Sequence, residues 1–427
     1  MENITAGKKL VLGFQHVLAM FGATVLVPFL TGLDPAIALF SAGVGTLLFH
    51  LCSKMIVPVF LGSSFAFIGA IALTLNPQGF DNSVLRGPGN WVNYLDTLAV
   101  VKGGIIAAGF VYILIAGLIY FLGVETIKKF FPPIITGPII VVIGLRLSPI
   151  AINSAFLNNG VFDLSYVAVS SIVLLTMIVV SIFAHGFFKM VPILIAVGVG
   201  YLVSVPFGLL DTTSIQEASM FTAFDPQVLS QLGTLPTFTL SGVIAIAPIA
   251  LVVFIEHIGD ITTNGAVVGK NFLENPGVHR TMLGDGVATV FAGLIGAPAN
   301  TTYSENTGVL AVTKVYDPKI IRIAAVIAIL LSFVGKFAAA IRSIPTPVMG
   351  GISIMLFGMI ASVGMRILIN AALDFSHSRN LIISAIILVL GIGVSELPLG
   401  ATGVTISGLA LAALFGVVLN IVLPQEI

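Results

Sequence analysis

Two glutamates stand where the sequence is otherwise apolar. Glu256 follows the apolar run 243–255, and Glu305 lies just before the apolar residues 309–312. Placing an ionised carboxylate at the centre of a bilayer costs about 2.5 to 3.5 kcal/mol even on insertion-based scales, so such residues face a cavity and usually act there. The two glutamates therefore predict a polar ligand site inside a membrane.

A third carboxylate, Asp260, follows Glu256 by one helical turn and so lies on the same face of a helix. Two acids this close hold a proton between them more readily than one acid alone, which would couple proton binding to transport. Alternatively, Asp260 is solvated near the cytoplasmic end of a span or bonded to a serine or threonine. The sequence leaves both interpretations open.

The whole chain has the composition of a polytopic membrane protein. Of its 427 residues, 57% are hydrophobic and 8% are charged, whereas a soluble domain has about 25% charged residues. Allowing about 30 residues for each span and its connection predicts roughly fourteen transmembrane spans. We place them near 10–30, 35–52, 56–75, 98–121, 131–148, 165–184, 190–209, 239–260, 282–297, 300–315, 319–341, 347–367, 379–395 and 403–423.

Charge and histidine spacing limit the partners. The net charge is zero, and the chain carries no basic tract, so we expect no nucleic-acid partner. The single cysteine, Cys52, excludes internal disulfides. The histidines do not have the spacing of a metal cluster, so we predict neither a metal nor another cofactor.

The basic residues favour an orientation with both termini in the cytoplasm. Of the 18 lysines and arginines, 13 then lie inside and five outside, the five being Arg86, Lys102, Arg146, Lys336 and Arg342. Cytoplasmic loops are the ones enriched in basic residues. The loop at 211–238 has acidic residues but no lysine or arginine, so we expect it to be external. The chain is predicted to be a multi-pass protein of the cytoplasmic membrane.

The two halves of the chain resemble each other. Matching spacings relate Pro133, Gly137 and Gly144 to Pro347, Gly351 and Gly358, and relate Pro58 with Ser64-Phe65 to Pro298 with Ser304-Glu305. The offset between copies changes along the chain, which an insertion at 76–98 in the first half would explain. Because seven spans per half is an odd number, the second copy is inverted relative to the first.

The repeat also predicts broken helices in spans 3 and 10. Segments 56–65 and 296–305 match, and each reads as extended residues that lead into a half-helix. Extended backbone is tolerated at this depth only where it is paired or lines a cavity. A helix that begins there points free N–H groups and partial positive charge into the middle of the protein.

Two carboxylate acceptors beside such N–H donors suit a small planar ring that alternates N–H with C=O. Uracil has this pattern, and so does the pyrimidine edge of a xanthine. A hydrogen bond from a neutral N–H to a carboxylate contributes about 1.5 to 3 kcal/mol, so a ligand without these groups is disfavoured. The alternative is that Glu256 and Glu305 are structural, each paired with a lysine or hydrogen-bonded within the bundle.

Other polar residues are weaker candidates. For His257 we favour a structural role in packing over ligand binding. Ser63 and Ser64 either donate hydrogen bonds to a ligand or cap the half-helix. Lys314 falls where span 10 meets the cytoplasm, and snorkelling of its side chain to the membrane surface explains it.

The segment Glu305-Asn306-Thr307-Gly308 and the residues that follow it, to Lys314, resemble the signature of the nucleobase-ascorbate transporters, also called the nucleobase:cation symporter-2 family. Gln15-His16 resembles the first-span pair of that family, residues 62–67 resemble its third-span break, and residues 256–260 its eighth-span acid motif. These motifs spread over most of the chain and are most similar to those of bacterial uracil permeases.

The resemblance implies an all-α membrane fold with fourteen spans in two inverted repeats of seven. It implies a core domain at 1–121 and 239–341 (spans 1–4 and 8–11) and a gate domain at 122–210 and 342–427 (spans 5–7 and 12–14), with 211–238 as an external loop. It further implies proton-coupled uptake, with protons as the coupling ion, and a homodimer formed through the gate domains.

The resemblance also assigns site residues. The substrate-binding acids match Glu256 and Glu305, and the backbone N–H donors match Phe65 and Ser304. Proton coupling is assigned to Glu256 and Asp260. The supporting positions are Gln15, His16, Ser64, Tyr303 and Asn306. A glutamate at the start of the signature favours uracil, since purine-transporting relatives often have glutamine there.

Two residues depart from the best-studied uracil permease of this family. That permease has histidine where this chain has Asp260, although aspartate is the commoner family residue, and glycine where this chain has Ser304. The details of proton coupling and the width of the pocket are therefore expected to differ.

The predicted function is proton-driven import of uracil by alternating access. The alternatives are a xanthine or uric acid permease, an anion carrier of a related fold, a passive channel and an intramembrane enzyme. A channel would not accumulate substrate against a gradient. An enzyme would need a nucleophile with a base, or a metal cluster, and the single cysteine and scattered histidines do not supply one.

Overall fold

The computed structural model describes residues 5–76, 85–87, 89–123, 126, 129, 132–186, 188–222, 225–394, 396–398 and 405–424. The elements of the first half are α1 (Ala6–Thr31), α2 (Pro35–Cys52), β1 (Leu61–Ser63), η1 (Phe65–Phe67), α3 (Ile68–Leu75), α5 (Trp91–Leu122), α7 (Pro133–Arg146), α8 (Ser148–Phe156), β2 (Leu157–Asn158), β3 (Val161–Phe162), α9 (Leu164–Phe183), η2 (Phe188–Met190) and α10 (Pro192–Ser204). The predicted insertion at 76–98 lies partly outside the described residues.

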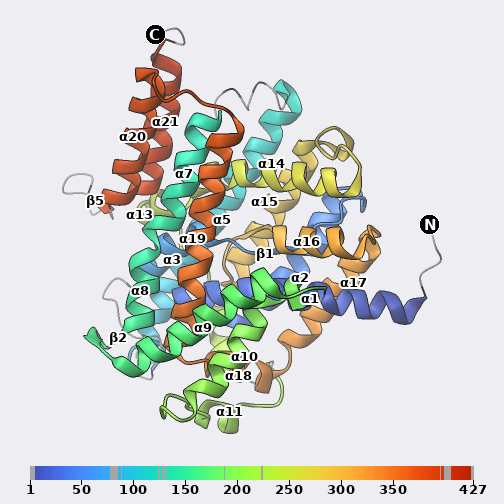
Figure 1. Ribbon diagram of the computed structural model, residues 1–427, viewed down its shortest axis with the longest axis vertical. Helices are drawn as coiled ribbons and strands as arrows, with labels where there is room; N and C mark the ends of the chain where they lie inside the picture. The colour runs from blue at the N-terminus through green and yellow to red at the C-terminus, as the bar shows by residue number, and fades with distance from the viewer. Residues whose placement is uncertain are drawn as a thin grey trace.

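The second half begins after two short helices, α11 (Thr213–Glu217) and α12 (Pro226–Gly233). Its elements are α13 (Leu240–Ile246), α14 (Ile249–Val268), η4 (Leu273–Gly277), α15 (Val278–Ile295), β4 (Asn300–Thr302), α16 (Ser304–Thr313), α17 (Pro318–Ser332), α18 (Gly335–Arg342), α19 (Thr346–Asn370), α20 (Ser378–Gly393), β5 (Glu396–Pro398), β6 (Thr405–Ser407) and α21 (Gly408–Val422). Figure 1 shows their arrangement.

The described residues contain seven helical segments long and apolar enough to cross a membrane: Ala6–Thr31, Pro35–Cys52, Trp91–Leu122, Pro133–Phe156, Leu164–Phe183, Leu240–Val268 and Thr346–Asn370. Shorter apolar helices cover Phe65–Leu75, Pro192–Ser204, Ser378–Gly393 and Gly408–Val422. The predicted helical membrane fold is thus confirmed, while the count of fourteen spans stays a prediction. Two predicted spans contain an interruption: within the segment Leu240–Val268 a turn at Pro248 separates α13 from α14, and 319–341 is divided at Val334, which pairs with Phe221.

Aspartate followed by proline begins three of the helices. Asp34 precedes α2, Asp225 precedes α12 and Asp317 precedes α17, and each side chain accepts a hydrogen bond from a backbone N–H of the first turn. Proline suits the first helical position because its φ is already helical and it has no N–H to satisfy. The Asp-Pro pairs in the local sequence therefore determine where these helices begin.

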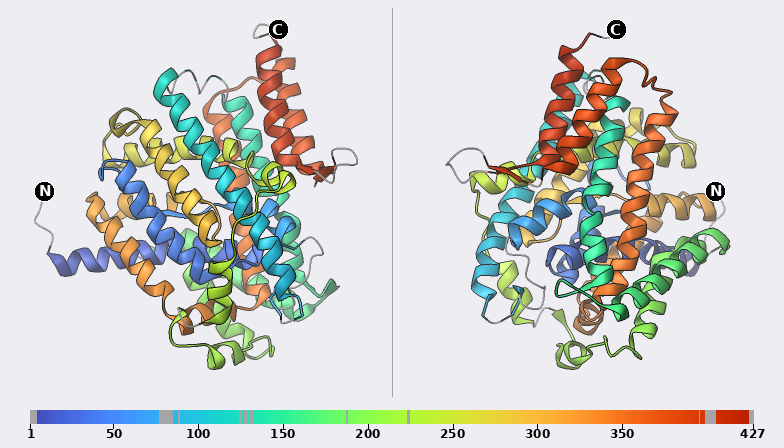
Figure 2. Two further views of the ribbon diagram at one scale, coloured as in Figure 1. Left: turned by 180° about the vertical axis from the view of Figure 1, so that it is seen from behind. Right: turned by 60° about the vertical axis from the view of Figure 1, so that its left-hand side comes forward.

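The helices pack in two groups, which Figure 2 shows from two sides. In the first group α15 packs on α5 and α2, and α17 packs on α2 and α1. In the second group α19 packs on α7, α8 and α9, and α20 packs on α7 and α21. The domain boundaries assigned from the family resemblance stay a prediction.

Glycines allow α5 and α15 to approach closely. A Cβ added at Gly109 would lie 2.7 Å from the backbone nitrogen of Val290, and one at Gly293 would lie 2.8 Å from the backbone nitrogen of Ile106. Membrane helices associate through such small residues, because lipid supplies no hydrophobic drive toward association.

The predicted external loop at 211–238 contains α11 and α12 and is tied to neighbouring helices. Nζ of Lys336 on α18 donates to the carbonyls of Ile215 and Gln216, at 2.7 and 2.9 Å. Nζ of Lys102 on α5 donates to the carbonyls of Gln231 and Thr234, each at 2.7 Å. The described part of this loop therefore packs on α5 and α18 through its backbone carbonyls.

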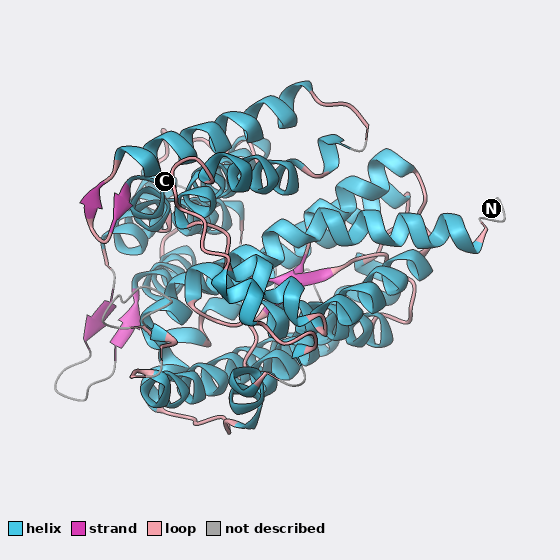
Figure 3. Cartoon of the chain, turned by 90° about the horizontal axis from the view of Figure 1, so that it is seen from below, coloured by secondary structure: helices cyan, strands magenta, loops and turns pink. Residues whose placement is uncertain are grey.

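Strands β1 and β4 pair in the interior of the helical bundle, as Figure 3 shows. They run antiparallel, with Leu61 opposite Thr302 and Ser63 opposite Asn300. Backbone bonds extend the pairing on both sides, from Ser64 N to Ala299 O at 2.8 Å and from Tyr303 N to Phe60 O at 3.0 Å. These strands occupy matching places in the two halves, and each is followed directly by a helix.

The pairing of β1 with β4 leaves no room for a side chain at Gly62. A Cβ there would lie 2.4 Å from two ring carbons of Tyr303, whose hydroxyl donates to the carbonyl of Ser63 at 2.9 Å. We expect Gly62→Ala to destabilise the protein by about 1 to 3 kcal/mol through overpacking, measured as thermal unfolding in detergent. Gly198→Ala on α10, where a Cβ meets nothing within 4 Å, is the control. Equal unfolding temperatures of the two variants would contradict the tight contact between Gly62 and Tyr303.

Candidate functional site

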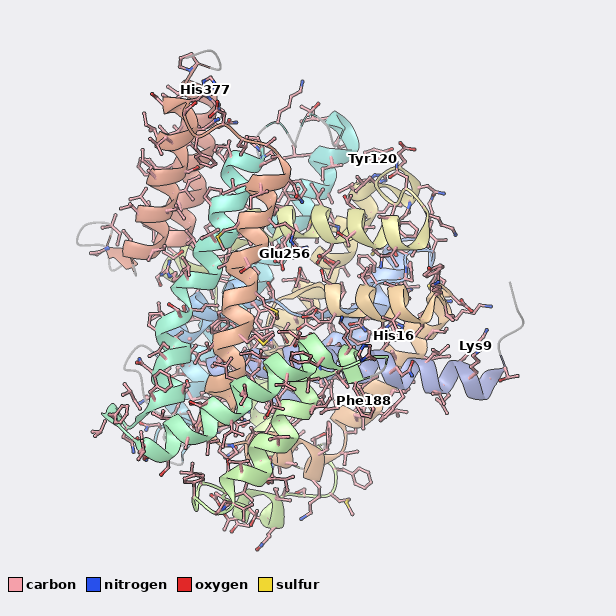
Figure 4. All side chains as sticks on the ribbon, viewed as in Figure 1. Lys9, His16, Tyr120, Phe188, Glu256 and His377 are labelled. Carbon is pink, nitrogen blue, oxygen red and sulfur yellow. The ribbon has the colours of Figure 1, made fainter. Side chains whose placement is uncertain are left out.

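The three acids singled out by the sequence come together beside the paired strands β1 and β4. Glu256 and Asp260 lie on α14, and Glu305 lies in the first turn of α16. Glu256 interacts electrostatically with both Asp260 and Glu305, and all three side chains are partly buried. Figure 4 shows Glu256 in the middle of the molecule, far from Lys9 at the protruding end of α1. Residues separated by up to 49 positions thus form one acidic cluster.

Two helix N-termini meet the same region. Phe65 is the first residue of η1 and Ser304 is the first residue of α16, and the side chains of the preceding residues, Ser64 and Tyr303, cap neither helix. The first N–H groups of a helix have no intrahelical acceptor and carry partial positive charge. Both positions predicted to donate backbone hydrogen bonds therefore stand at helix starts.

The two serines before η1 differ in their contacts. Ser63 Oγ donates to the carbonyl of Thr24 at 3.3 Å. Ser64 Oγ is buried and has no hydrogen-bond partner among the described residues. The capping interpretation of these serines is therefore wrong, and Ser64 keeps a free hydroxyl beside the helix start.

Asp260 is held by two hydroxyl groups. Thr302 Oγ1 donates to one carboxylate oxygen at 2.7 Å, and Ser304 Oγ donates to the other at 2.5 Å. The bond to a serine or threonine that the sequence allowed is therefore present, while the coupling role of Asp260 stays a prediction. The two residues that depart from the best-studied uracil permease, Asp260 and Ser304, thus contact each other, and their bond joins α14 to α16.

Removing one of these hydroxyls tests what Asp260 does for the fold. We expect Thr302→Val to lower stability by about 1.5 to 3 kcal/mol, because it leaves a carboxylate oxygen without its donor. The matched control is Thr262→Val, whose exposed side chain bonds only to its own helix, to the carbonyl of Ile258 at 2.7 Å. If thermal unfolding in detergent shows no difference between the two variants, the bond to Thr302 contributes nothing to stability.

His257 has the structural role expected of it. Its Nδ1 lies 2.8 Å from Oδ2 of Asp285, its Nε2 lies 2.9 Å from Oγ1 of Thr281, and the exposed fraction of each side chain is 0%. Asp285 was missed in the sequence. The signal was present, since Asp285 is an acid within the apolar helix α15, the same feature that marked Glu256. Its Oδ1 has no hydrogen-bond partner in the described part of the chain.

The remaining predicted residues surround the strand pair. Asn306 Nδ2 donates to His16 Nδ1 at 3.1 Å and to the His16 carbonyl at 3.0 Å, so α16 is fixed to α1. The buried Oε1 of Gln15 has no partner among the described residues. Asn264, which the sequence did not indicate, donates through Nδ2 to Pro58 O at 3.2 Å and to Thr307 Oγ1 at 3.1 Å.

Neither Glu256 nor Glu305 is neutralised by a basic side chain among the described residues. Within the described ranges, the ion pairs join other acids, and neither Glu256 nor Glu305 takes part in one. Lys314, at the end of α16, is its C-cap residue in a left-handed conformation with φ 54°. The alternative in which each glutamate is paired with a lysine does not describe these residues. The cluster therefore offers acceptors to a ligand, with N–H donors nearby.

Comparison with known proteins places this chain in a family. The model of the family described as "Permease family" matches residues 7–400. The chain is 43% identical over 425 residues to the uracil permease of Bacillus caldolyticus, covering 99% of this chain and 94% of that protein. It is 39% identical over 414 residues to the uracil permease of Escherichia coli (strain K12), covering 96% and 90%.

A solved structure shares the fold. The transmembrane domain of the cyanobacterial bicarbonate transporter BicA superposes with a TM-score of 0.58 at 16% identity, covering 97% of this chain and 96% of that one. At this identity the likeness concerns the fold alone. The similarity to the nucleobase-ascorbate transporters predicted from the motifs is confirmed: the chain belongs to the permease family and is a multi-pass membrane transporter rather than an enzyme.

Proposed function

We propose that the chain imports uracil across the cytoplasmic membrane by proton symport. The observation that carries this proposal is the placement of Glu256 and Glu305 beside the helix starts at Phe65 and Ser304. Uracil presents two N–H donors and two carbonyl acceptors around one flat ring. Two carboxylates and two backbone N–H groups are complementary to that edge pattern, and each bond to a carboxylate contributes about 1.5 to 3 kcal/mol.

The charge of the site supports a neutral substrate over an anion. Glu256, Glu305 and Asp260 place three acids in one cluster, and none of them pairs with a lysine or arginine among the described residues. Bicarbonate would meet like charges there, and like charges in a site of low dielectric repel strongly. The substrate therefore differs from that of the bicarbonate transporter whose fold the chain shares.

The names of the relatives support uracil in particular. Both permeases compared above are described as uracil permeases, and they align with nearly the whole chain. Glu305 is the first residue of the family signature, and a glutamate at that position favours uracil over purines. A xanthine or uric acid permease is the alternative, and competition by purine bases distinguishes it.

We assign proton binding to Glu256 and a positioning role to Asp260. Both oxygens of Asp260 already accept hydrogen bonds from hydroxyl groups, at 2.7 and 2.5 Å. Glu256 lies one turn earlier on the same helix, beside Asp260 and Glu305, and neighbouring acids that interact bind protons as a coupled set. In this scheme the carboxylate that takes the proton also contacts the substrate.

Alternating access follows from motion of the first helix group, as the core domain, against the second, as the gate domain. The proposed substrate site lies on the first group, because α16 packs on α1 and α14 packs on α5 and α16. Transporters with inverted repeats expose a midplane site to each side in turn by such rocking or gating. The homodimer would form through gate domains, which leaves the core domain free to move.

Uptake of labelled uracil into proteoliposomes tests the proposal. We expect accumulation when an inward proton gradient is imposed, loss of accumulation when the gradient is collapsed, and competition by unlabelled uracil but not by xanthine. Uptake that ignores the gradient would remove the symport assignment, and uptake that only equilibrates would indicate a channel. Competition by xanthine would favour the purine alternative.

A further inference from the structure

A large cavity lies between the two helix groups, and Glu256, Asp260 and Glu305 are not among the residues that line it. Its volume is about 820 Å³. One wall is formed by Leu73 and Asn76 at the end of α3 and by Arg342 at the end of α18, and the other by Ile150 and Asn153 on α8. The C-terminal end of α1 also lines it. With the N-terminus in the cytoplasm, as predicted, this end of α1 faces the outside.

A second, much smaller cavity lies deeper along α3. Its volume is about 20 Å³, enough for about one water molecule. Ala66, Gly69 and Ala70 line it, together with Ile143, Arg146 and Leu147 near the end of α7. Ala66 directly follows Phe65, whose backbone N–H is one of the proposed substrate contacts. The small cavity therefore adjoins the proposed site.

One side chain, Leu73, lines both cavities. Ala66, Gly69 or Ala70, Leu73 and Asn76 follow one another at intervals of three or four residues, so they form a single face of η1 and α3. That face runs from the helix break to the large cavity. It carries small residues up to Leu73, and a Cβ added at Gly69 would meet nothing within 4 Å.

The opposite face of α3 is closed. Ile71 and Leu75 have exposed fractions of 0% and 1% and belong to the hydrophobic core. Leu73, by contrast, is 39% exposed. On the cavity-lining face Ala66 and Ala70 are also buried, at 7% and 8% exposed, and belong to the same core cluster. The open part of that face is therefore formed by Gly69 and Leu73, and Leu73 is its bulky side chain, between the two cavities.

The large cavity has no excess of positive charge. Arg86 and Arg342 line it, and both contact Oδ2 of Asp34, at 2.8 and 3.1 Å. Asp225 lies 3.8 Å from Arg342, and Asp211 also lines the cavity. The arginines are thus matched by acids, and a cavity of this kind does not collect anions. It suits a neutral polar heterocycle.

We propose that the large cavity is the outer vestibule for the substrate, and that Leu73 is the gate residue on the access route along α3 to the site at Phe65. This inference rests on the proposed function. The substrate passes from the vestibule over the small-residue face of α3 once Leu73 moves aside. Leu73 thus controls the rate of access from outside, while the affinity of the site depends on the glutamates.

The single cysteine of the chain makes a direct test possible. Cys52→Ala removes it, and Leu73→Cys is then added in that background. Intact cells are treated with a positively charged, membrane-impermeant methanethiosulfonate reagent. We expect modification to lower labelled-uracil uptake about tenfold or more, since a bulky charged group blocks the gate. Saturating uracil should change the rate of modification.

The binding affinity separates a blocked route from a damaged site. In detergent both sides of the protein are accessible, so modified Leu73→Cys protein should bind uracil with a Kd within about twofold of the unmodified value. A much weaker Kd would make Leu73 part of the binding site and overturn its assignment as a gate. Unchanged uptake after complete modification would overturn it as well.

Two further variants complete the experiment. Val92→Cys, 70% exposed in the first turn of α5 and not among the cavity residues, should react without loss of uptake. Asn153→Cys, on α8 at the same cavity, should also lose uracil uptake on modification. This variant replaces Leu73→Cys in the experiment if Leu73→Cys fails to fold. If Val92→Cys reacts and neither cavity variant does, the cavity is not an outer vestibule. If the wild-type protein neither binds nor carries uracil, the proposed function itself fails.

Discussion

Glu305→Gln is expected to raise the Kd for uracil about 10- to 160-fold, the equivalent of one hydrogen bond to a charged acceptor worth about 1.5 to 3 kcal/mol. Glutamine keeps the size of the side chain but replaces a charged acceptor with a neutral amide. Glu305 lies in the first turn of α16, and no ion pair joins it to another described residue. Calorimetry on the purified protein in detergent measures the Kd.

The control for this substitution is Glu274→Gln. Glu274 is exposed and lies in η4, on the connection between α14 and α15, so its loss should leave the Kd unchanged. Thermal unfolding should show that both variants are folded. Full uracil affinity in a folded Glu305→Gln protein would place the ligand elsewhere and would remove the basis of the proposed function.

Glu256→Gln separates substrate binding from proton binding. We expect a loss of affinity of the same order, and in addition uptake that no longer responds to the proton gradient, because an amide does not titrate. Glu305→Gln protein at saturating uracil should keep its response to the gradient. The same gradient response in both variants would move the coupling role away from Glu256.

Asp34→Ala is expected to produce the largest loss of stability, about 3 to 5 kcal/mol, because it leaves two arginines without their shared carboxylate. The exposed fraction of Asp34 is 0%. Its Oδ1 caps α2 by accepting from the backbone nitrogens of Ala36 and Ile37, at 2.8 and 3.3 Å. Its Oδ2 lies 2.8 Å from Arg86 and 3.1 Å from Arg342.

Thermal and chemical unfolding in detergent measure this effect. Asp374→Ala is the matched control, because Asp374 is 60% exposed and its carboxylate contacts the exposed His377 and the backbone nitrogen of Ser376, the latter at 2.8 Å. Its loss should change stability by about 1 kcal/mol or less. The loss of stability in Asp34→Asn should lie between those of Asp34→Ala and Asp374→Ala, since an amide oxygen can still cap α2 but carries no charge. Wild-type stability in Asp34→Ala would mean that the arginines find other partners.

Much of the fold was predictable because the membrane imposes simple rules on sequence. A span needs about 20 apolar residues, and a helix satisfies every backbone group within itself, so the helical class follows from composition. The predicted second span, 35–52, matches α2, whose start is marked by Asp34-Pro35. The segments 56–65 and 296–305 were singled out because the two halves have the same residue spacing there, and β1 and β4 lie within them.

The acids of the site were also predictable, for an energetic reason. A carboxylate inside a span is costly enough that Glu256 and Glu305 stand out in any reading of the chain. The same rule applied to Asp285 would have found the partner of His257. What the rule does not supply is the neighbour of each acid, and so the sequence left the role of Asp260 undecided between proton binding and a bond to a hydroxyl group.

The sequence by itself determined that this chain spans a membrane as helices, that two of its spans are broken, and that acids lie among them. Only the tertiary structure decided that Thr302 and Ser304 occupy both oxygens of Asp260, that Arg86 and Arg342 share Asp34, and that Leu73 lies between two cavities. The physical reason is one of range. Spans and helix starts follow from residues within a few turns of each other, whereas these contacts join segments far apart in the chain that meet only when the helices pack.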